Sequence, residues 1–272
     1  MSDLFPLAGG VAVVTGAASG IGAALSAALA ARGCHLALVD RDPVGLASTA
    51  ANCRGVAVST HHVDIADRDA IAALPDAVLG AHGRVTILIN NAGVALGGQF
   101  SHISLDDFAW VMDINLWGVV RMTHAFLPML RTQPVAQIVN LSSIFGIIAP
   151  AGQTAYCASK FAVRGFSESL RAELATTGIG VTVVHPGGVA TAIARSARRG
   201  QGVQISPDEE AAMQDRMKRF LKMPPPAAAA MIMDGIERRR KRVLVGRDAK
   251  MMAFVQWLFP VRYHRVLAWM AK

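Results

Sequence analysis

The stretch Thr15-Gly16-Ala17-Ala18-Ser19-Gly20-Ile21-Gly22 decides the fold of this chain. It follows a short apolar run and opens into an Ala-rich segment that is typical of a helix. Glycines at such a strand-to-helix turn let the backbone approach a pyrophosphate, and the helix N-terminus adds free N–H groups and a favourable dipole. The spacing is G-x-x-x-G-x-G, and Gly-rich turns also arise for purely structural reasons. The residues expected to bind a dinucleotide here are Gly16, Ser19, Gly20, Ile21 and Gly22.

Short apolar runs recur along the chain, separated by segments long enough for helical crossovers. Buried parallel strands are typically continuous runs of Val, Ile and Leu like these. The pattern predicts an α/β fold, a Rossmann-type doubly wound parallel sheet of seven strands in the order 3-2-1-4-5-6-7. The runs are Val11–Thr15, Leu36–Val39, Val56–Ser59, Ile87–Asn90, Ile138–Leu141, Val181–His185 and Val243–Val245.

The composition is that of a folded protein. Of 272 residues, 53% are hydrophobic and 17% are charged, which suits one α/β domain with a large core. We expect residues 1–247 to form the dinucleotide-binding catalytic domain and residues 248–272 to form an amphipathic helical tail. The three cysteines lack metal-ligand spacing, so we expect reduced thiols, a cytoplasmic protein and no metal site. No basic stretch precedes an apolar run at the N-terminus, so a signal peptide is not expected.

The end of the second predicted strand bears on the choice of cofactor. Asp40 follows the glycines at about the 20-residue distance where an acidic side chain binds the adenosine ribose hydroxyls. A carboxylate there also repels a 2′-phosphate, so we expect NAD. Arg41 adjoins it, and a guanidinium could instead pair with that phosphate, which leaves NADP as the alternative. Asp40 could otherwise be the N-cap of a helix that starts near Pro43.

Two further strand ends carry candidate cofactor residues. The third predicted strand ends near Asp64 and Ile65, where a side-chain carboxylate could bond the adenine amino group. The fourth ends at Asn90 and is followed by Asn91-Ala92-Gly93. The small residues leave room for a cofactor, and the Asn amides can tie neighbouring strands together. We expect Asn91, Ala92 and Gly93 to contact the dinucleotide.

The candidate catalytic residues follow the fifth predicted strand. Ser143 lies at its end, and Tyr156 and Lys160 share one face of the next predicted helix because they are four positions apart. A free tyrosine has a pKa of about 10, and a nearby ammonium or the positive charge of an oxidised nicotinamide favours the phenolate. We therefore expect Lys160 to lower the pKa of Tyr156 into the range of general acid/base catalysis, and Ser143 to hold the substrate oxygen.

Taken in order, these motifs resemble those of the short-chain dehydrogenase/reductase family. T-G-x-x-x-G-I-G, N-N-A-G, the serine, Y-x-x-x-K and P-G all occur, between about Val11 and Thr191, with a last strand at Arg242–Val245. The resemblance implies hydride transfer between a nicotinamide and a secondary alcohol or ketone, in a homodimer or homotetramer. The alternatives are an epimerase or dehydratase on the same scaffold, or a non-catalytic dinucleotide sensor. Length and glycine spacing favour the dehydrogenase, and a sensor would be expected to lose Tyr156 or Lys160.

The resemblance implies roles for further residues. Asn115 matches the family's helix Asn, which holds a water in a proton relay with Lys160 and Tyr156. Lys160 and Tyr156 also contact the cofactor in that family, Lys160 through the nicotinamide ribose. The segment that clasps the nicotinamide carboxamide and the adjoining phosphate matches Pro186, Gly187, Val189 and Thr191. Without the resemblance, Asn115 reads as a helix-interior Asn and Pro186-Gly187 as a plain turn.

The substrate side is less clearly marked. A polar, basic connection at residues 192–226 follows a strand's carboxyl end, so we expect a substrate lid there, with a variable surface insertion as the alternative. Ile144, Phe145 and Ile147 follow Ser143 and are expected to line the substrate side. Together with the apolar tail they suggest a lipophilic substrate such as a steroid, a fatty ketone or a retinoid-like alcohol.

The positive charge is concentrated near the C-terminus. The net charge is +8, and residues 195–272 hold 17 Lys/Arg against 7 Asp/Glu, including the cluster at residues 238–242. We expect residues 248–272 to form a helix whose apolar face, with Phe254, Trp257, Leu258 and Leu267, is buried against protein. Peripheral membrane contact is the alternative, since arginines beside aromatics suit a membrane interface. Nucleic-acid binding is not expected, because no motif or stacking platform accompanies the charge.

Overall fold

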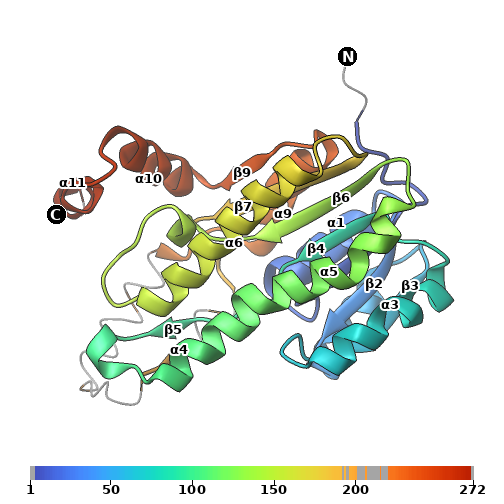
Figure 1. The fold of residues 1–272 in the computed structure, drawn as a ribbon, viewed down its shortest axis with the longest axis horizontal. Coiled ribbons are helices and arrows are strands. Elements are labelled where there is room, and N and C mark those ends of the chain that lie inside the picture. The colour runs from blue at the N-terminus through green and yellow to red at the C-terminus, as the bar shows by residue number, and fades with distance from the viewer. Residues whose placement is uncertain are drawn as a thin grey trace.

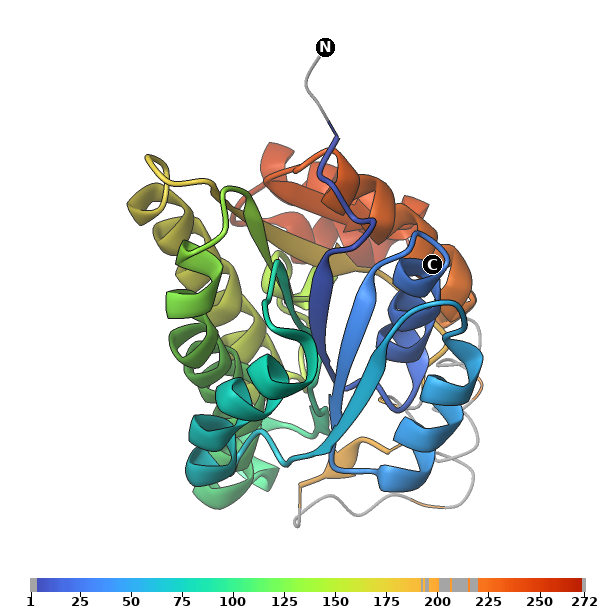
Figure 2. The same cartoon turned by 90° about the vertical axis from the view of Figure 1, so that its right-hand side faces the viewer.

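A computed structural model describes residues 4–191, 193, 196–200, 206, 215 and 220–270. Seven parallel strands form a twisted sheet between two layers of helices (Figure 1, Figure 2). The order is β3-β2-β1-β4-β6-β7-β9, which confirms the predicted doubly wound arrangement when the strands of this sheet are counted in sequence. The strands are β1 (Val11–Thr15), β2 (His35–Asp40), β3 (Val58–His62), β4 (Ile87–Asn90), β6 (Ala136–Leu141), β7 (Ile179–Pro186) and β9 (Arg242–Val245).

Each face of the sheet is covered by its own set of helices. Alternate strand residues point to opposite faces, so that Val14 packs on one side of β1 and Val13 on the other. One face is covered by α1 (Gly20–Ala30), α2 (Pro43–Asn52) and α9 (Pro225–Glu237). The other is covered by α3 (Arg68–His82), α5 (Gly118–Arg131) and α6 (Thr154–Glu173). The remaining short elements are α4 (Leu105–Met112), the π-helix η2 (Asp113–Trp117), and the 3-10 helices η1 (Phe100–His102) and η3 (Ile144–Gly146).

One predicted strand is displaced. The apolar run Val56–Ser59 places the third strand two residues too early, because β3 runs from Val58 to His62. β3 lies at the sheet edge and is half exposed, so it can contain polar residues. An apolar run in the sequence therefore does not show where this strand begins and ends. A separate pair of parallel strands, β5 (Leu96–Gly97) and β8 (Arg198–Arg199), joins the region after β4 to the region after β7.

The C-terminal tail forms two helices and not the single helix expected. They are α10 (Arg247–Leu258) and α11 (Tyr263–Met270), and Pro260 lies in the break because it lacks the N–H that a continuing helix needs. Figure 1 shows both at one corner of the molecule, beyond β9. Within the described residues, no helix combines the length and apolar content needed to cross a membrane. Most of the expected lid at residues 192–226 lies outside the described residues.

Candidate active site

The Gly-rich turn forms a cradle at the carboxyl edge of β1. Gly16 has a φ of +65°, and a Cβ there would lie 2.7 Å from the side-chain nitrogen of Asn91. A Cβ on Gly22 would lie 2.0 Å from the carbonyl oxygen of Gly16. Ser19 makes no side-chain cap, and the first turn of α1 carries no acidic residue. The first N–H groups of α1 are thus free of a side-chain cap and of negative charge, which fits a pyrophosphate.

Asp40 extends from the end of β2 toward the same turn. Its Oδ2 accepts a hydrogen bond from the N–H of Ala18 at 3.0 Å, and its Oδ1 accepts from Asp42 at 3.1 Å. The alternative role for Asp40 is wrong, because the N-cap of α2 is Asp42, whose carboxylate accepts from Val44 and Gly45. Asp40 is therefore fixed beside the Gly-rich turn, with oxygen lone pairs left for further donors.

The segment after β4 is tied to the Gly-rich turn. The Asn91 side chain donates to the carbonyl oxygens of Thr15 and Gly16 at 3.0 and 3.1 Å. The backbone N–H groups of Asn91 and Ala92 both donate to the Thr15 hydroxyl. Asn91 thus holds the cradle in shape, and Thr15, the first residue of the motif, is a positioning residue whose role the motif alone did not indicate. Gly93 is adjacent, and a Cβ there would lie 3.4 Å from the Lys160 ammonium.

The other residues expected near the adenosine lie at the ends of β2 and β3. Unlike Asp40 and Asn91, they have no hydrogen bond to the Gly-rich turn among the bonds described. Asp64 is exposed, and its Oδ1 accepts from Ala66 in its own turn at 2.9 Å. Ile65 is buried beneath Gly118. Arg41 is exposed, and its carbonyl oxygen is hydrogen-bonded to a ring nitrogen of His62. Their contacts with a dinucleotide stay predictions.

The segment after β7 folds back onto the Gly-rich turn. β7 ends at Pro186, and the Gly187 N–H donates to the Val245 carbonyl at 2.9 Å. Val189 and Thr191 follow in a tight turn, in which the Thr191 N–H donates to the Val189 oxygen at 2.9 Å. Thr191 lies against Gly20, because a Cβ on that glycine would be 3.2 Å from the threonine methyl. The structure thus brings the two ends of the predicted cofactor site together.

The two adjacent serines have different environments. Ser142 is buried, and its hydroxyl donates to the carbonyl oxygen of Lys160 at 2.8 Å. Ser143 caps η3 by accepting from the Phe145 N–H at 3.1 Å, and its hydroxyl lies near enough to the Tyr156 phenol to lower the pKa of that phenol. The geometry favours Ser143 as the serine beside Tyr156, as the spacing had indicated.

His185 supports Ser143 from the buried strand β7. Its Nδ1 lies 2.9 Å from the Ser143 carbonyl oxygen, and its Nε2 is buried with no partner among the described residues. Burial lowers the pKa of His185 to about 4, although the hydrogen bond to Ser143 opposes the shift. His185 is therefore neutral at physiological pH and holds the backbone of Ser143. The sequence offered one signal, a polar residue inside an apolar strand.

Tyr156 and Lys160 both lie on the inner side of α6. The Lys160 Nζ is 5.7 Å from the centre of the Tyr156 ring and donates to the Leu141 carbonyl at 3.0 Å. The expected lowering of the tyrosine pKa is wrong for this structure, because burial raises the pKa of Tyr156 to about 12 and outweighs the hydrogen bond from Ser143. Burial also lowers the pKa of Lys160 to about 8. Desolvation thus dominates both groups, and Tyr156 is a protonated phenol at neutral pH.

Asn115 lies in the π-helix between α4 and α5 and is fully buried. Its Oδ1 accepts from the Val94 N–H at 2.8 Å, and its Nδ2 donates to the Val94 oxygen and to the Ser159 hydroxyl, both at 3.0 Å. The side chain therefore joins the segment after β4 to α6. Both Nδ2 hydrogens are used in these bonds, whereas Oδ1 keeps a second lone pair, and a water relay through Asn115 stays a prediction. Single-turn π-helices are frequent at functional sites.

The residues after Ser143 do not all face the substrate side. Ile144 and Ile147 are buried in a cluster with Ala249 and Ala253 of α10, so their expected place in the substrate lining is wrong. The 3-10 turn that Ser143 caps directs them under the tail. Phe145 lies beside Tyr156, with the two rings edge-on and their centroids 6.2 Å apart.

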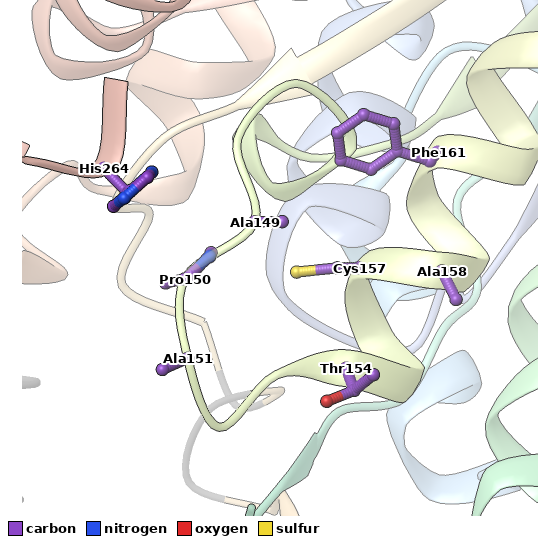
Figure 3. Close-up of a pocket in the computed structure, with 8 residues that line it drawn as sticks. All are labelled: Ala149, Pro150, Ala151, Thr154, Cys157, Ala158, Phe161 and His264. Atoms are coloured by element: carbon purple, nitrogen blue, oxygen red, sulfur yellow. The ribbon is translucent and has the colours of Figure 1, made fainter. Parts of the chain in front are cut away.

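An apolar cavity of about 670 Å³ lies between the start of α6 and α11 (Figure 3). Tyr156 and Ser143 are not among its lining residues, so it is separate from the catalytic groups. Cys157 points into it, but burial raises the pKa of this thiol to about 11, so it is not a thiolate nucleophile at neutral pH. Its lining residues are Ala149, Pro150, Ala151, Thr154, Cys157, Ala158, Phe161 and His264.

The three cysteines, all within the described residues, are buried free thiols. In the part of the chain that the structure describes, no group of three or more His, Cys, Asp or Glu side chains is arranged to hold a metal ion. The site is thus built from backbone amides, hydroxyls, one buried ammonium and the Asp40 carboxylate.

Comparison with known proteins places this site in a family. The model of the short chain dehydrogenases matches residues 10–202. The protein SadH of Mycobacterium tuberculosis is 41% identical over 264 residues, which cover 96% of this chain and 94% of SadH. D-threitol dehydrogenase of Mycolicibacterium smegmatis is 39% identical over 198 residues, 72% of this chain and 76% of that enzyme.

Solved structures agree with the family model. A short chain dehydrogenase/reductase from Burkholderia phymatum in complex with NAD matches with a TM-score of 0.84 at 31% identity, over 94% of this chain and 95% of that one. A short chain dehydrogenase from Mycobacterium paratuberculosis bound to NAD matches with a TM-score of 0.78 at 26% identity, over 91% and 100% of the two chains. With the family model covering most of the catalytic region, this chain belongs to the short-chain dehydrogenase/reductase family of oxidoreductases.

Proposed function

We propose that this oxidoreductase interconverts a secondary alcohol and a ketone, with Tyr156 as the acid/base. The observation that carries the proposal is the placement of the Ser143 hydroxyl near the Tyr156 phenol, whose pKa it lowers, with the Lys160 ammonium 5.7 Å from the same ring. Two hydroxyls that meet in this way can together hold one substrate oxygen.

The protonation states support proton donation by Tyr156. Because burial raises the pKa of Tyr156 to about 12, the phenol holds its proton at neutral pH and can give it to a carbonyl oxygen. Ser143 would hold that oxygen as its negative charge develops. Lys160 keeps a positive charge near the phenol and stabilises the phenolate left after donation, although burial lowers its pKa to about 8. In alcohol oxidation the proton moves the other way, from the alcohol to Tyr156.

The cofactor we propose is NAD, with NADP as the alternative. When bound, the nicotinamide donates or accepts the hydride. The Gly-rich turn and the uncapped start of α1 would hold the pyrophosphate, and Asp40 would accept hydrogen bonds from the adenosine ribose. Two similar structures, from Burkholderia phymatum and Mycobacterium paratuberculosis, are NAD complexes, which supports this choice.

The substrate we propose is lipophilic, in a homodimeric or homotetrameric enzyme. Apolar side chains flank the catalytic and cofactor-clasping groups, since Phe145 contacts the ring of Tyr156 and Phe220 lies against Gly188. Such surroundings favour an apolar carbon skeleton around the reacting carbon over a strongly hydrated one.

The test follows NADH absorbance with purified enzyme. Apolar secondary alcohols are offered with NAD, and the matching ketones with NADH, beside polyols of similar size. The proposal expects turnover of the apolar compounds, lost in Tyr156→Phe. Equal rates in Tyr156→Phe and the wild type would refute the assigned role of Tyr156. If the protein binds NADH but converts none of these alcohols and ketones, the result would favour the alternative of a non-catalytic dinucleotide sensor.

A further inference from the structure

The first residues after β9 form a helix that presents its large side chains outward. Along α10, Met251, Phe254, Trp257 and Leu258 follow one another at helical spacing, so they form one stripe. Trp257 is 74% exposed, and its ring stacks at a tilt on Phe254 with the centroids 6.0 Å apart. The stripe continues into the break before α11. We call this surface the tail face, and its residues are Met251, Phe254, Trp257, Leu258, Phe259 and Val261.

The opposite side of α10 packs on the protein mainly through small residues, since Ala249, Ala253 and Val255 are buried and Met252 is partly buried. Ala249 and Ala253 are buried against the isoleucines of the turn after Ser143, and the Tyr263 hydroxyl accepts from the Ala149 N–H at 2.9 Å. The tail is therefore held on the protein by its small side and by α11. A helix that only had to cover this core would direct its largest apolar side chains inward. Here the large side chains point outward, and a contiguous apolar surface of this kind marks an interaction site.

The charge of the tail is of one sign. No acidic residue follows Asp248, whereas Lys250, Arg262 and Arg265 are exposed beside the tail face. Asp248 itself is engaged by the Gly188 N–H. Aromatic residues bordered by Lys and Arg suit the boundary between headgroups and acyl chains, where rings enter the apolar layer and cations meet anionic lipid. We propose that the tail face docks on an anionic lipid bilayer.

Charge also argues against a second copy on this face. In a two-fold interface a surface meets its own copy, and the tail holds no acidic residue after Asp248 that could pair with Lys250, Arg262 and Arg265 of that copy. A layer of anionic headgroups neutralises these charges.

Three of the five basic residues at 238–242 are engaged within the protein. Arg238 and Arg240 form ion pairs with Asp234, and Arg239 donates to the Gly178 carbonyl. These three arginines therefore have partners within the protein, and the docking proposal is argued from the cations of the tail.

The test is co-sedimentation of the full chain with vesicles of phosphatidylcholine alone, or of phosphatidylcholine and phosphatidylglycerol, at low and high salt. The wild type should pellet with the anionic vesicles at low salt and be released as salt screens the attraction. The double variant Arg262→Gln/Arg265→Gln should bind about thirty-fold less tightly, at about fivefold per charge. Phe254→Ser/Trp257→Ser should lose about tenfold for each ring. Leu105→Ser changes an equally exposed apolar residue, 81% exposed on α4, and should bind like the wild type.

Size-exclusion chromatography with light scattering separates the remaining outcomes. The proposal is overturned if the wild type does not bind anionic vesicles. It is also overturned if the tail variants and Leu105→Ser bind these vesicles equally well. If Phe254→Ser/Trp257→Ser instead splits an oligomer and the wild type binds no lipid, the tail face is occupied by a second copy. Because both ring substitutions are at exposed positions, thermal unfolding should show the variants folded, so that loss of binding is not loss of structure.

Discussion

The carboxylate of Asp248, in the first turn of α10, accepts a hydrogen bond from the backbone N–H of Gly188 at 2.6 Å. Gly187 packs so closely on the same carboxylate that a Cβ there would lie 2.2 Å from Oδ2. The turn that follows Pro186 is therefore fixed by a residue of the C-terminal tail. This links the tail to the segment expected to clasp the nicotinamide.

Replacing Asp248 should loosen that clasp. Asp248→Ala leaves the Gly188 N–H without its acceptor, and we expect the Kd for NADH to rise about tenfold, in line with the loss of a charged hydrogen bond. Asp248→Asn keeps one acceptor oxygen and should lose less. NADH fluorescence titration measures both. Asp106→Ala, an exposed acid in the first turn of α4, is the matched control and should bind NADH like the wild type. If the Kd of Asp248→Ala for NADH is unchanged, the turn after Pro186 keeps its shape without the Asp248 carboxylate.

Tyr156→Phe removes only the phenolic hydroxyl. We expect kcat to fall by about 10²–10⁴-fold, the usual contribution of general acid/base catalysis, with the Kd for NADH nearly unchanged. The chain has two tyrosines, so Tyr263→Phe is the matched control. It removes the hydroxyl that accepts from Ala149, away from the catalytic groups, and should keep activity within tenfold. Comparable losses in the two variants would rule out Tyr156 as the acid/base.

His185 should make the protein sensitive to acid. Its pKa is about 4 in the folded protein and about 6.5 when unfolded, so the unfolded chain binds the proton more readily. The stability is fully present above the unfolded pKa, and it is lost as the pH falls from about 6.5 through 4. Urea unfolding at pH 7 and pH 5 should show a loss of up to about 2 kcal/mol from this group. In His185→Gln that part of the pH dependence should vanish. His102→Gln, at an exposed position, is the control variant for the same urea measurement. If the free energy of unfolding of His185→Gln still falls between pH 7 and pH 5 as it does in the wild type, His185 is not the source of the acid sensitivity.

Most of the fold could be predicted from the sequence because the central strands are buried on both faces. β1, β2, β4, β6 and β7 read as continuous apolar runs, and only the exposed edge strand β3 was displaced. The motif residues were found by spacing, since Tyr156 and Lys160 lie on one helix and the Gly-rich turn is contiguous. Local patterns of this kind need no knowledge of tertiary packing.

The residues that position these groups come from distant parts of the chain. Asp248 meets Gly188 across 60 positions, and His185 meets Ser143 across 42. No local pattern marks such pairs. The burial of the Ile144 side chain likewise depends on the distant tail, because α10 packs over the turn after Ser143. The sequence pattern had indicated a position beside the substrate for this side chain. The pKa of Tyr156 rose because of burial, a property of the whole fold that spacing along a helix does not reveal.

Asp40 and Arg41 should together set the choice between the two dinucleotides. Asp40 is held beside the Gly-rich turn by the Ala18 N–H, so its negative charge would meet a 2′-phosphate, and kcat/KM should favour NAD over NADP. Asp40→Ala removes the repulsion and leaves the exposed Arg41 to pair with the phosphate, so the preference should narrow or reverse. Adding Arg41→Ala should lower kcat/KM for NADP relative to Asp40→Ala alone, with little change for NAD. Asp64→Ala is the control, since the expected partner of this exposed carboxylate is the adenine that both dinucleotides share, and it should not alter the preference between NAD and NADP. A wild-type preference for NADP would mean that the guanidinium of Arg41 outweighs the carboxylate of Asp40 at this strand end.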